Sequence, residues 1–159
     1  MMIELLRSPE FNVAVENHTS QEFVLITGNP ARLGEEPGMT VAEIWKTITR
    51  GRDLDRVAMA ISWEGSYINA RTIILGPIFH NPKAFTDIKG VKDLLEAYGN
   101  STSAFQRGTL IHEFAHIIFN MGDNELAAFW DLANKGYDIS NASSAIGLFI
   151  ANDCKPKSN

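Results

Sequence analysis

The chain has one cysteine, Cys154, among its 159 residues. A single cysteine cannot form a disulfide within the chain, so cysteine usage does not identify the redox compartment. The first residues, Met1-Met2-Ile3-Glu4, lack the basic and then apolar order of a signal peptide. The sequence therefore leaves two compartments open: the protein is secreted if a leader was removed, and cytoplasmic otherwise.

Long apolar runs and clusters of basic residues are also missing. No apolar run approaches the roughly 20 residues that a membrane-spanning helix needs. No cluster of Lys and Arg is longer than a pair, and the formal net charge is -5. Because nucleic acids and anionic membranes attract clustered positive charge, we expect neither as the main partner. We predict a soluble protein without membrane insertion, and the composition indicates no oligomeric state.

The length suits a single domain, because 159 residues can bury one hydrophobic core without disulfides. We therefore expect one domain over residues 1–159. Strand patterns occupy the first half, at residues 11–16, 23–26, 57–63 and 72–79. Pro77 indicates that the last of these is an edge strand, because proline cannot donate to a hydrogen-bond ladder on both sides.

Helical periodicity begins at residues 41–48 and dominates the second half of the chain. The later predicted helices cover residues 91–98, 101–120, 124–135 and 141–153. Strands first and helices afterwards are typical of an α+β domain rather than of alternating β-α-β units. We therefore predict the α+β class.

The segment His112-Glu113-Phe114-Ala115-His116 matches the pattern H-E-x-x-H within one predicted helix. A spacing of four residues places both imidazoles on one helix face, about one turn apart, where they can bind one ion. Zinc accepts imidazole nitrogen and lowers the pKa of a bound water toward about 7. Glu113 lies about 100° round the helix from His112, so it can flank that water as a general base.

The competing interpretation is that these residues form the wet face of an amphipathic helix. Apolar residues surround most of the helix circumference and leave only a narrow polar strip: Leu110, Ile111, Phe114, Ala115, Ile117, Ile118 and Phe119. Such a helix is mostly buried, and two imidazoles and a carboxylate buried without partners would be costly. A metal ion removes that cost, which favours metal binding over a buried histidine pair without metal.

We expect an acidic third ligand, because His112 and His116 are the last histidines in the chain. The metzincin pattern is excluded, since it needs glycine where Phe119 stands and histidine where Gly122 stands. The acidic candidates downstream are Asp123, Glu125, Asp131 and Asp138.

Asp123 is preferred as the third ligand. Asn120 or Gly122 can adopt a left-handed conformation, end the helix and fold the chain back. The alternative role of Asp123 is a cap for the helix at 124–135. Glu125 and Asp131 stay open as ligands, because either could face the ion if the two helices pack antiparallel.

Three further residues have weaker functional interpretations. His80 follows the last predicted strand and either faces a cleft or is an exposed loop residue. Tyr137 either stabilises an oxyanion or packs on the core. Cys154 is interpreted as a small residue that closes the last helix rather than as a ligand.

On its H-E-x-x-H segment and helix, the chain resembles the zincin metallopeptidases. That resemblance implies a zincin-like α+β fold: a small mixed or antiparallel sheet in the N-terminal half, packed on an active-site helix, with a helical C-terminal half. By order, the strand at 71–79 would correspond to the zincin edge strand, which aligns an extended substrate. Residues 108–113, the pair Gly122-Asp123 and the segment 139–154 also look like a group of small bacterial metallopeptidase-like proteins, which favours Asp123 as a ligand.

The leading functional prediction is zinc-dependent hydrolysis of peptide bonds in a peptide or protein substrate. In it His112, His116 and Asp123 bind Zn²⁺, and Glu113 is the catalytic base. Two alternatives stay open. One is a non-catalytic zinc-binding domain that binds a protein partner, and the other is a metal-free interaction domain.

Overall fold

The computed structural model describes residues 12–14, 24–27, 57–61 and 72–158. The helix expected at residues 41–48 lies outside them. The chain divides into two compact units, Met1–His80 and Asn81–Asn159. The expectation of one domain stays a prediction.

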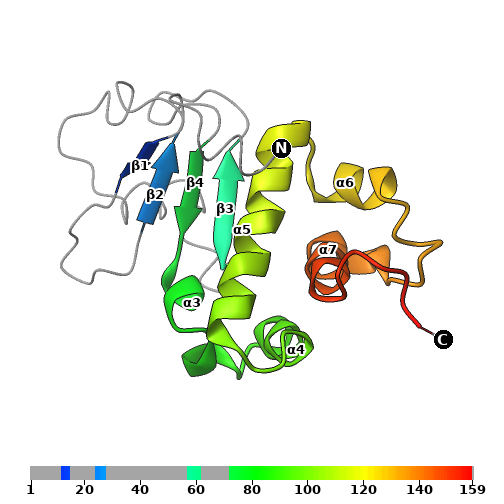
Figure 1. Ribbon diagram of the computed structural model, residues 1–159, viewed down its shortest axis with the longest axis horizontal. Coiled ribbons are helices and arrows are strands. Elements are labelled where there is room, and N and C mark those ends of the chain that lie inside the picture. The colour runs from blue at the N-terminus through cyan, green and yellow to red at the C-terminus, as the bar shows by residue number, and fades with distance from the viewer. Residues whose placement is uncertain (1–11, 15–23, 28–56, 62–71, 159) are drawn as a thin grey trace. The chain divides into compact units, whose positions relative to one another are not determined.

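Helices dominate the described residues, and those of the second unit confirm the predicted helical C-terminal half (Figure 1). The elements of this unit are η2 (Pro82–Phe85), α4 (Lys89–Ala97), α5 (Thr102–Phe119), α6 (Asp123–Phe129), η3 (Ile139–Asn141) and α7 (Ala142–Ala151). Within the described part of the chain, no helix combines the length and the apolar character needed to cross a membrane.

Helix α6 is shorter than the predicted helix at 124–135, because Asp131 has a left-handed backbone with a φ of 54°. Just beyond it, the Leu132 N–H donates to the Ala127 carbonyl over 3.0 Å, which closes the helix end. This reversal places Leu132, with no exposed surface, in the core. Because α6 ends early, Leu132 can be buried in the core.

The first unit contains four described strands: β1 (Asn12–Ala14), β2 (Val24–Thr27), β3 (Ala58–Ile61) and β4 (Thr72–Leu75). They pair in the order β1-β2-β4-β3, and each neighbouring pair is antiparallel. The prediction of an edge strand at 72–79 is therefore wrong, because β4 has a hydrogen-bonded neighbour on each side.

The prediction was wrong because Pro77 does not belong to the strand. The strand β4 ends at Leu75, and Pro77 opens the short helix α3 (Pro77–His80). Proline is well suited to the first helical position, where its fixed φ is helical and the missing N–H has no intrahelical acceptor.

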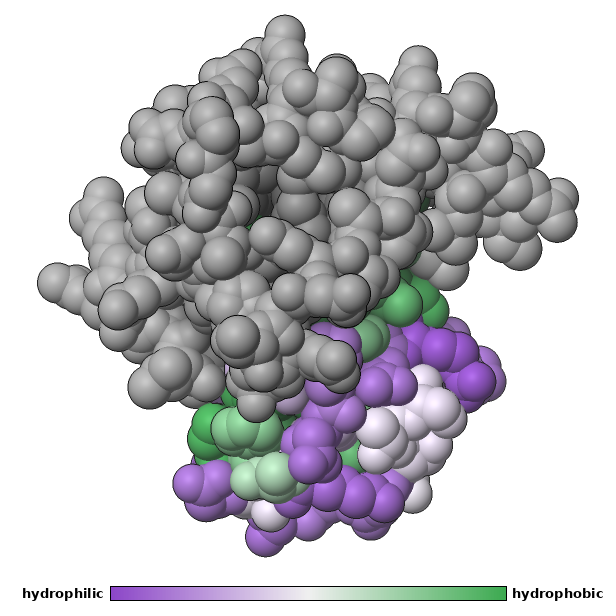
Figure 2. All heavy atoms as spheres, turned by 90° about the vertical axis from the view of Figure 1, so that its left-hand side faces the viewer, coloured by the Kyte–Doolittle hydropathy of each residue, from purple (hydrophilic) through white to green (hydrophobic). Residues whose placement is uncertain are grey.

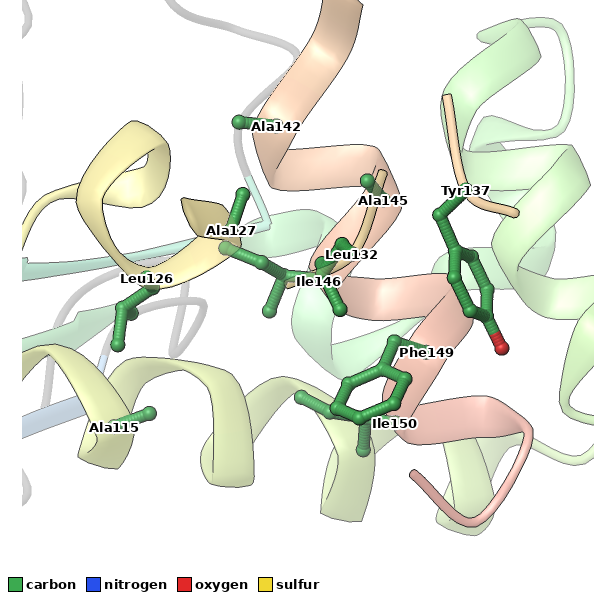
Figure 3. Packing of buried hydrophobic residues seen from close by; sticks show 10 residues of the cluster. All are labelled: Ala115, Leu126, Ala127, Leu132, Tyr137, Ala142, Ala145, Ile146, Phe149 and Ile150. Carbon is green, nitrogen blue, oxygen red and sulfur yellow. The ribbon is translucent and has the colours of Figure 1, made fainter. Parts of the chain in front are cut away.

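The core of the second unit is built from α5, α6, α7 and the turns between the last two helices (Figure 3). Its members are Ala115, Leu126, Ala127, Leu132, Tyr137, Ala142, Ala145, Ile146, Phe149 and Ile150. Helix α7 packs against α4, α5 and α6. Helix α4 buries Val91 and Leu95 and exposes charged residues. On the face shown in Figure 2, the described residues present hydrophilic areas with hydrophobic ones between them. These contacts fix the frame that carries the H-E-x-x-H segment.

Tyr98, at the end of α4, packs directly on glycines of two other helices. Its hydroxyl donates a hydrogen bond of 3.2 Å to the Gly147 carbonyl in α7. A Cβ at Gly108 in α5 would lie 1.9 Å from the Tyr98 hydroxyl oxygen. Burial raises the pKa of Tyr98 to about 12. The absence of a side chain at Gly108 therefore allows α4 to approach α5.

We predict that Gly108→Ala lowers the free energy of unfolding by about 1–3 kcal/mol, because the added methyl group overlaps the Tyr98 ring. The matched control is Gly90→Ala in α4, where an added Cβ meets no atom within 4 Å. It should stabilise the protein by about 0.4–1 kcal/mol. Urea unfolding of both variants measures the difference, and equal stability would contradict the close packing.

Candidate metal centre

Helix α5 places the two histidines of the H-E-x-x-H segment on one face. Its N-terminus is capped by Ser101, whose side chain accepts a hydrogen bond from the Ala104 N–H over 3.3 Å. The ring centroids of His112 and His116 lie 4.9 Å apart. Both side chains are largely buried, with 11% and 14% of their surface exposed. The predicted spacing therefore produces a paired imidazole site.

The chain reverses directly after α5 and brings Asp123 back to the histidines. Asn120 adopts the left-handed conformation, with φ 52° and ψ 46°, as predicted for a residue of this turn. Asp123 then opens α6, and its Oδ1 lies 2.8 Å from His112 Nε2 and 3.1 Å from His116 Nε2. One donor atom from each residue falls within 4.8 Å of the others. The group is close enough to bind one metal ion.

The hydrogen bonds define which ring nitrogen of His116 faces Asp123. His116 Nδ1 lies 2.7 Å from the Met121 carbonyl oxygen, which can only accept, so Nδ1 carries the hydrogen. In the neutral ring, Nε2 then directs a lone pair toward Asp123 Oδ1. Two acceptors at 3.1 Å need a proton or a cation between them. The donor set fits a metal cation for this reason.

The electrostatics of the cluster keep Asp123 ionised. Burial raises its pKa, but the hydrogen bonds and charges of His112 and His116 outweigh burial and hold the pKa well below the usual range. Burial lowers the pKa of His116, and this is outweighed by its hydrogen bonds to Asp123 and the Met121 carbonyl and by the charges of Glu113 and Asp123, so its pKa is raised. An anionic oxygen beside two imidazoles suits zinc and other first-row transition metals.

Glu113 is buried beside this group. Only 7% of its surface is exposed, and its charge contributes to the raised pKa of His116. Among the residues that the structure describes, His112 and Glu113 are the buried polar or charged side chains of the core. The buried polarity of the described chain is thus concentrated in the H-E-x-x-H segment.

The other acidic candidates have partners of their own. The Glu125 carboxylate accepts a hydrogen bond from the Gly122 N–H over 2.8 Å. Asp131 accepts from the Asn134 side chain over 2.8 Å, and Asp138 accepts from the Ser140 N–H over 3.0 Å. Both aspartates are exposed, and neither belongs to the metal-binding group.

The three weaker candidates also lie outside the group. Tyr137 is buried against Phe149, and its hydroxyl donates to the Lys155 carbonyl over 2.8 Å, which confirms the interpretation as a core residue. Cys154 is exposed after α7. His80 belongs to the first unit, where its ring meets the Phe79 ring edge-on at 5.4 Å.

The Met121 carbonyl is a part of the described site that the sequence did not reveal. Every residue has a carbonyl, so no residue type marks this role. The only signal was indirect, because the left-handed conformation of Asn120 changes the direction of the carbonyl of the next residue, Met121. Comparison of the chain with protein-family models, with curated proteins and with solved structures finds no match.

We predict that Asp123→Asn weakens binding of Zn²⁺, used here as the probe ion, by at least about tenfold, because it removes the anionic donor. The matched control is Asp131→Asn, which removes one negative charge from an exposed position outside the group. Competition with a chromophoric chelator gives both dissociation constants. Equal weakening by the two variants would assign the effect to net charge and would contradict ligation by Asp123.

Proposed function

We propose that the chain is a zinc-dependent metallopeptidase of the zincin type. The observation that supports this most directly is the convergence of Asp123 on His112 and His116, with Glu113 buried next to them. Two imidazoles and one carboxylate are the protein ligand set of many catalytic zinc sites, in which a fourth position stays open.

The roles of the residues follow from their chemistry. His112, His116 and Asp123 would hold the zinc ion, and the Met121 carbonyl would orient the His116 ring. Zinc in such a site lowers the pKa of a bound water toward about 7 and polarises a substrate carbonyl. Glu113 accepts the proton of the attacking water and transfers it to the leaving nitrogen as the peptide bond breaks.

The class of substrate and of fold are part of the same proposal. A peptide or protein substrate is proposed because the H-E-x-x-H helix with this ligand set is typical of peptidases. A zincin-like α+β fold is proposed because the chain places its strands before the H-E-x-x-H helix. Both statements rest on the resemblance and on the site chemistry together.

We predict that Glu113→Gln retains Zn²⁺ but loses about 10²–10⁴-fold in peptidase activity, because glutamine cannot accept the proton of the attacking water. The matched control is Glu96→Gln, an exposed residue of α4 that should leave activity unchanged. Zinc content by elemental analysis and cleavage of a fluorogenic peptide library give the two readouts.

Two outcomes would contradict this function. Full activity in Glu113→Gln would exclude Glu113 as the base. A wild-type chain that binds one zinc ion but cleaves no peptide would instead favour a non-catalytic zinc-binding domain that binds a protein partner.

A further inference from the structure

We infer that the turn between α5 and α6, residues 120–122, sets the geometry of the metal centre, with Asn120 and Glu125 as positioning residues. This inference rests on the proposed metal centre and adds two residues outside the ligand set to it.

The chain changes direction at Asn120. If α5 continued as a straight helix, Asp123 would lie about 10 Å further along the axis than His116, given 1.5 Å per residue. The left-handed conformation of Asn120, with a φ of 52°, ends the helix and allows Asp123 to return to 3.1 Å from His116. Asparagine and glycine adopt this conformation readily, whereas β-branched residues do not.

The turn also contacts a ligand of the proposed metal centre. The Met121 carbonyl, which directly follows Asn120, accepts the His116 Nδ1–H over 2.7 Å. This bond sets the orientation and the tautomer of the ring, so that Nε2 faces Asp123 Oδ1. The same backbone reversal therefore orients His116 and brings Asp123 close to it.

The far end of the turn, at Gly122, is held by two hydrogen bonds. The Gly122 N–H donates to the Glu125 carboxylate over 2.8 Å, and the Gly122 carbonyl accepts from the Leu126 N–H over 2.9 Å. Leu126 has no exposed surface and lies in the core. The first turn of α6, which begins with Asp123, is thus fixed both by Glu125 and by the core.

The hydrogen bond from Gly122 gives Glu125 a role that differs from ligation. A ligand carboxylate binds through its charge, whereas the observed contact needs only an oxygen that accepts one hydrogen bond. Glu125→Gln keeps such an oxygen and Glu125→Ala does not. A comparison of the two variants therefore distinguishes a positioning role of Glu125 from metal ligation, and neither variant changes the number of residues in the loop.

The experiment measures the dissociation constant of Zn²⁺ for the full chain by competition with a chromophoric chelator. Asn120→Gly and Glu125→Gln should stay within about twofold of the wild type, because each keeps the required conformation or contact. Asn120→Val should weaken binding about tenfold, and Glu125→Ala about fivefold. The absorption spectrum of bound Co²⁺ should change in Asn120→Val, because the coordination geometry changes.

Asn100→Val is the matched control for Asn120→Val. Asn100 is also left-handed, with a φ of 58°, but it precedes α5 at the end remote from the histidines. Both valine variants should lower the melting temperature in the presence of chelator. Only Asn120→Val should change the dissociation constant and the Co²⁺ spectrum. A purely structural role would leave both readouts unchanged.

The outcomes distinguish this inference from the proposed function. A wild-type chain that binds no Zn²⁺ overturns the metal centre itself. Tight wild-type binding with an unchanged dissociation constant in Asn120→Val and Glu125→Ala overturns the positioning role alone. A loss in Glu125→Gln equal to that in Glu125→Ala overturns the role of Glu125 as a positioning residue and assigns it to the ligands. If Asn120→Val fails to fold, the comparison of Glu125→Gln with Glu125→Ala still tests whether the turn positions the ligands.

Discussion

A straight helix can present two imidazoles to one ion, and a further donor has to come from a segment that returns to the same face. In this chain that constraint is met by the contact of Asp123 Oδ1 with Nε2 of His112 and His116, at 2.8 and 3.1 Å. The contact requires α5 to stop within one turn of His116 and α6 to start at once. The position of α6 in the helical unit therefore depends on the geometry of the polar group.

The hydrophobic core supports the same arrangement from the other side. Ala115 lies between the two histidines in the sequence, yet it belongs to the cluster that includes Leu126 of α6 and Ile146 of α7. A small residue at this point of α5 lets α6 approach closely, which keeps Asp123 within reach of the imidazoles. The polar group and the core thus fix the same helix pair, and a change in one alters the other.

Much of the site could be predicted because its residues lie close together in the sequence, with the two histidines at a spacing that places them on one helix face. The i, i+4 spacing predicted the histidine pair, and Asn120 or Gly122 before a nearby acidic residue predicted the reversal and Asp123 as the preferred ligand. The Met121 carbonyl could not be predicted, because backbone oxygens have no sequence signal. The contact of Glu125 with Gly122 was equally hidden, since a carboxylate two residues from a ligand suits ligation and capping alike. Pro77 was misassigned because proline suits both an edge strand and a helix start.

The angular order of residues on α5 bears on whether the group catalyses or only binds. At about 100° per residue, His116 lies about 40° from His112, Glu113 about 100° on the same side, and Ala115 about 60° on the other. Since Ala115 faces the core cluster, Glu113 lies on the flank of the histidine pair that is turned away from that cluster. A carboxylate on this flank is beside the ligands rather than among them. A base that takes the proton of an attacking water would lie on such a flank, and this position of Glu113 supports the catalytic form of the proposed function.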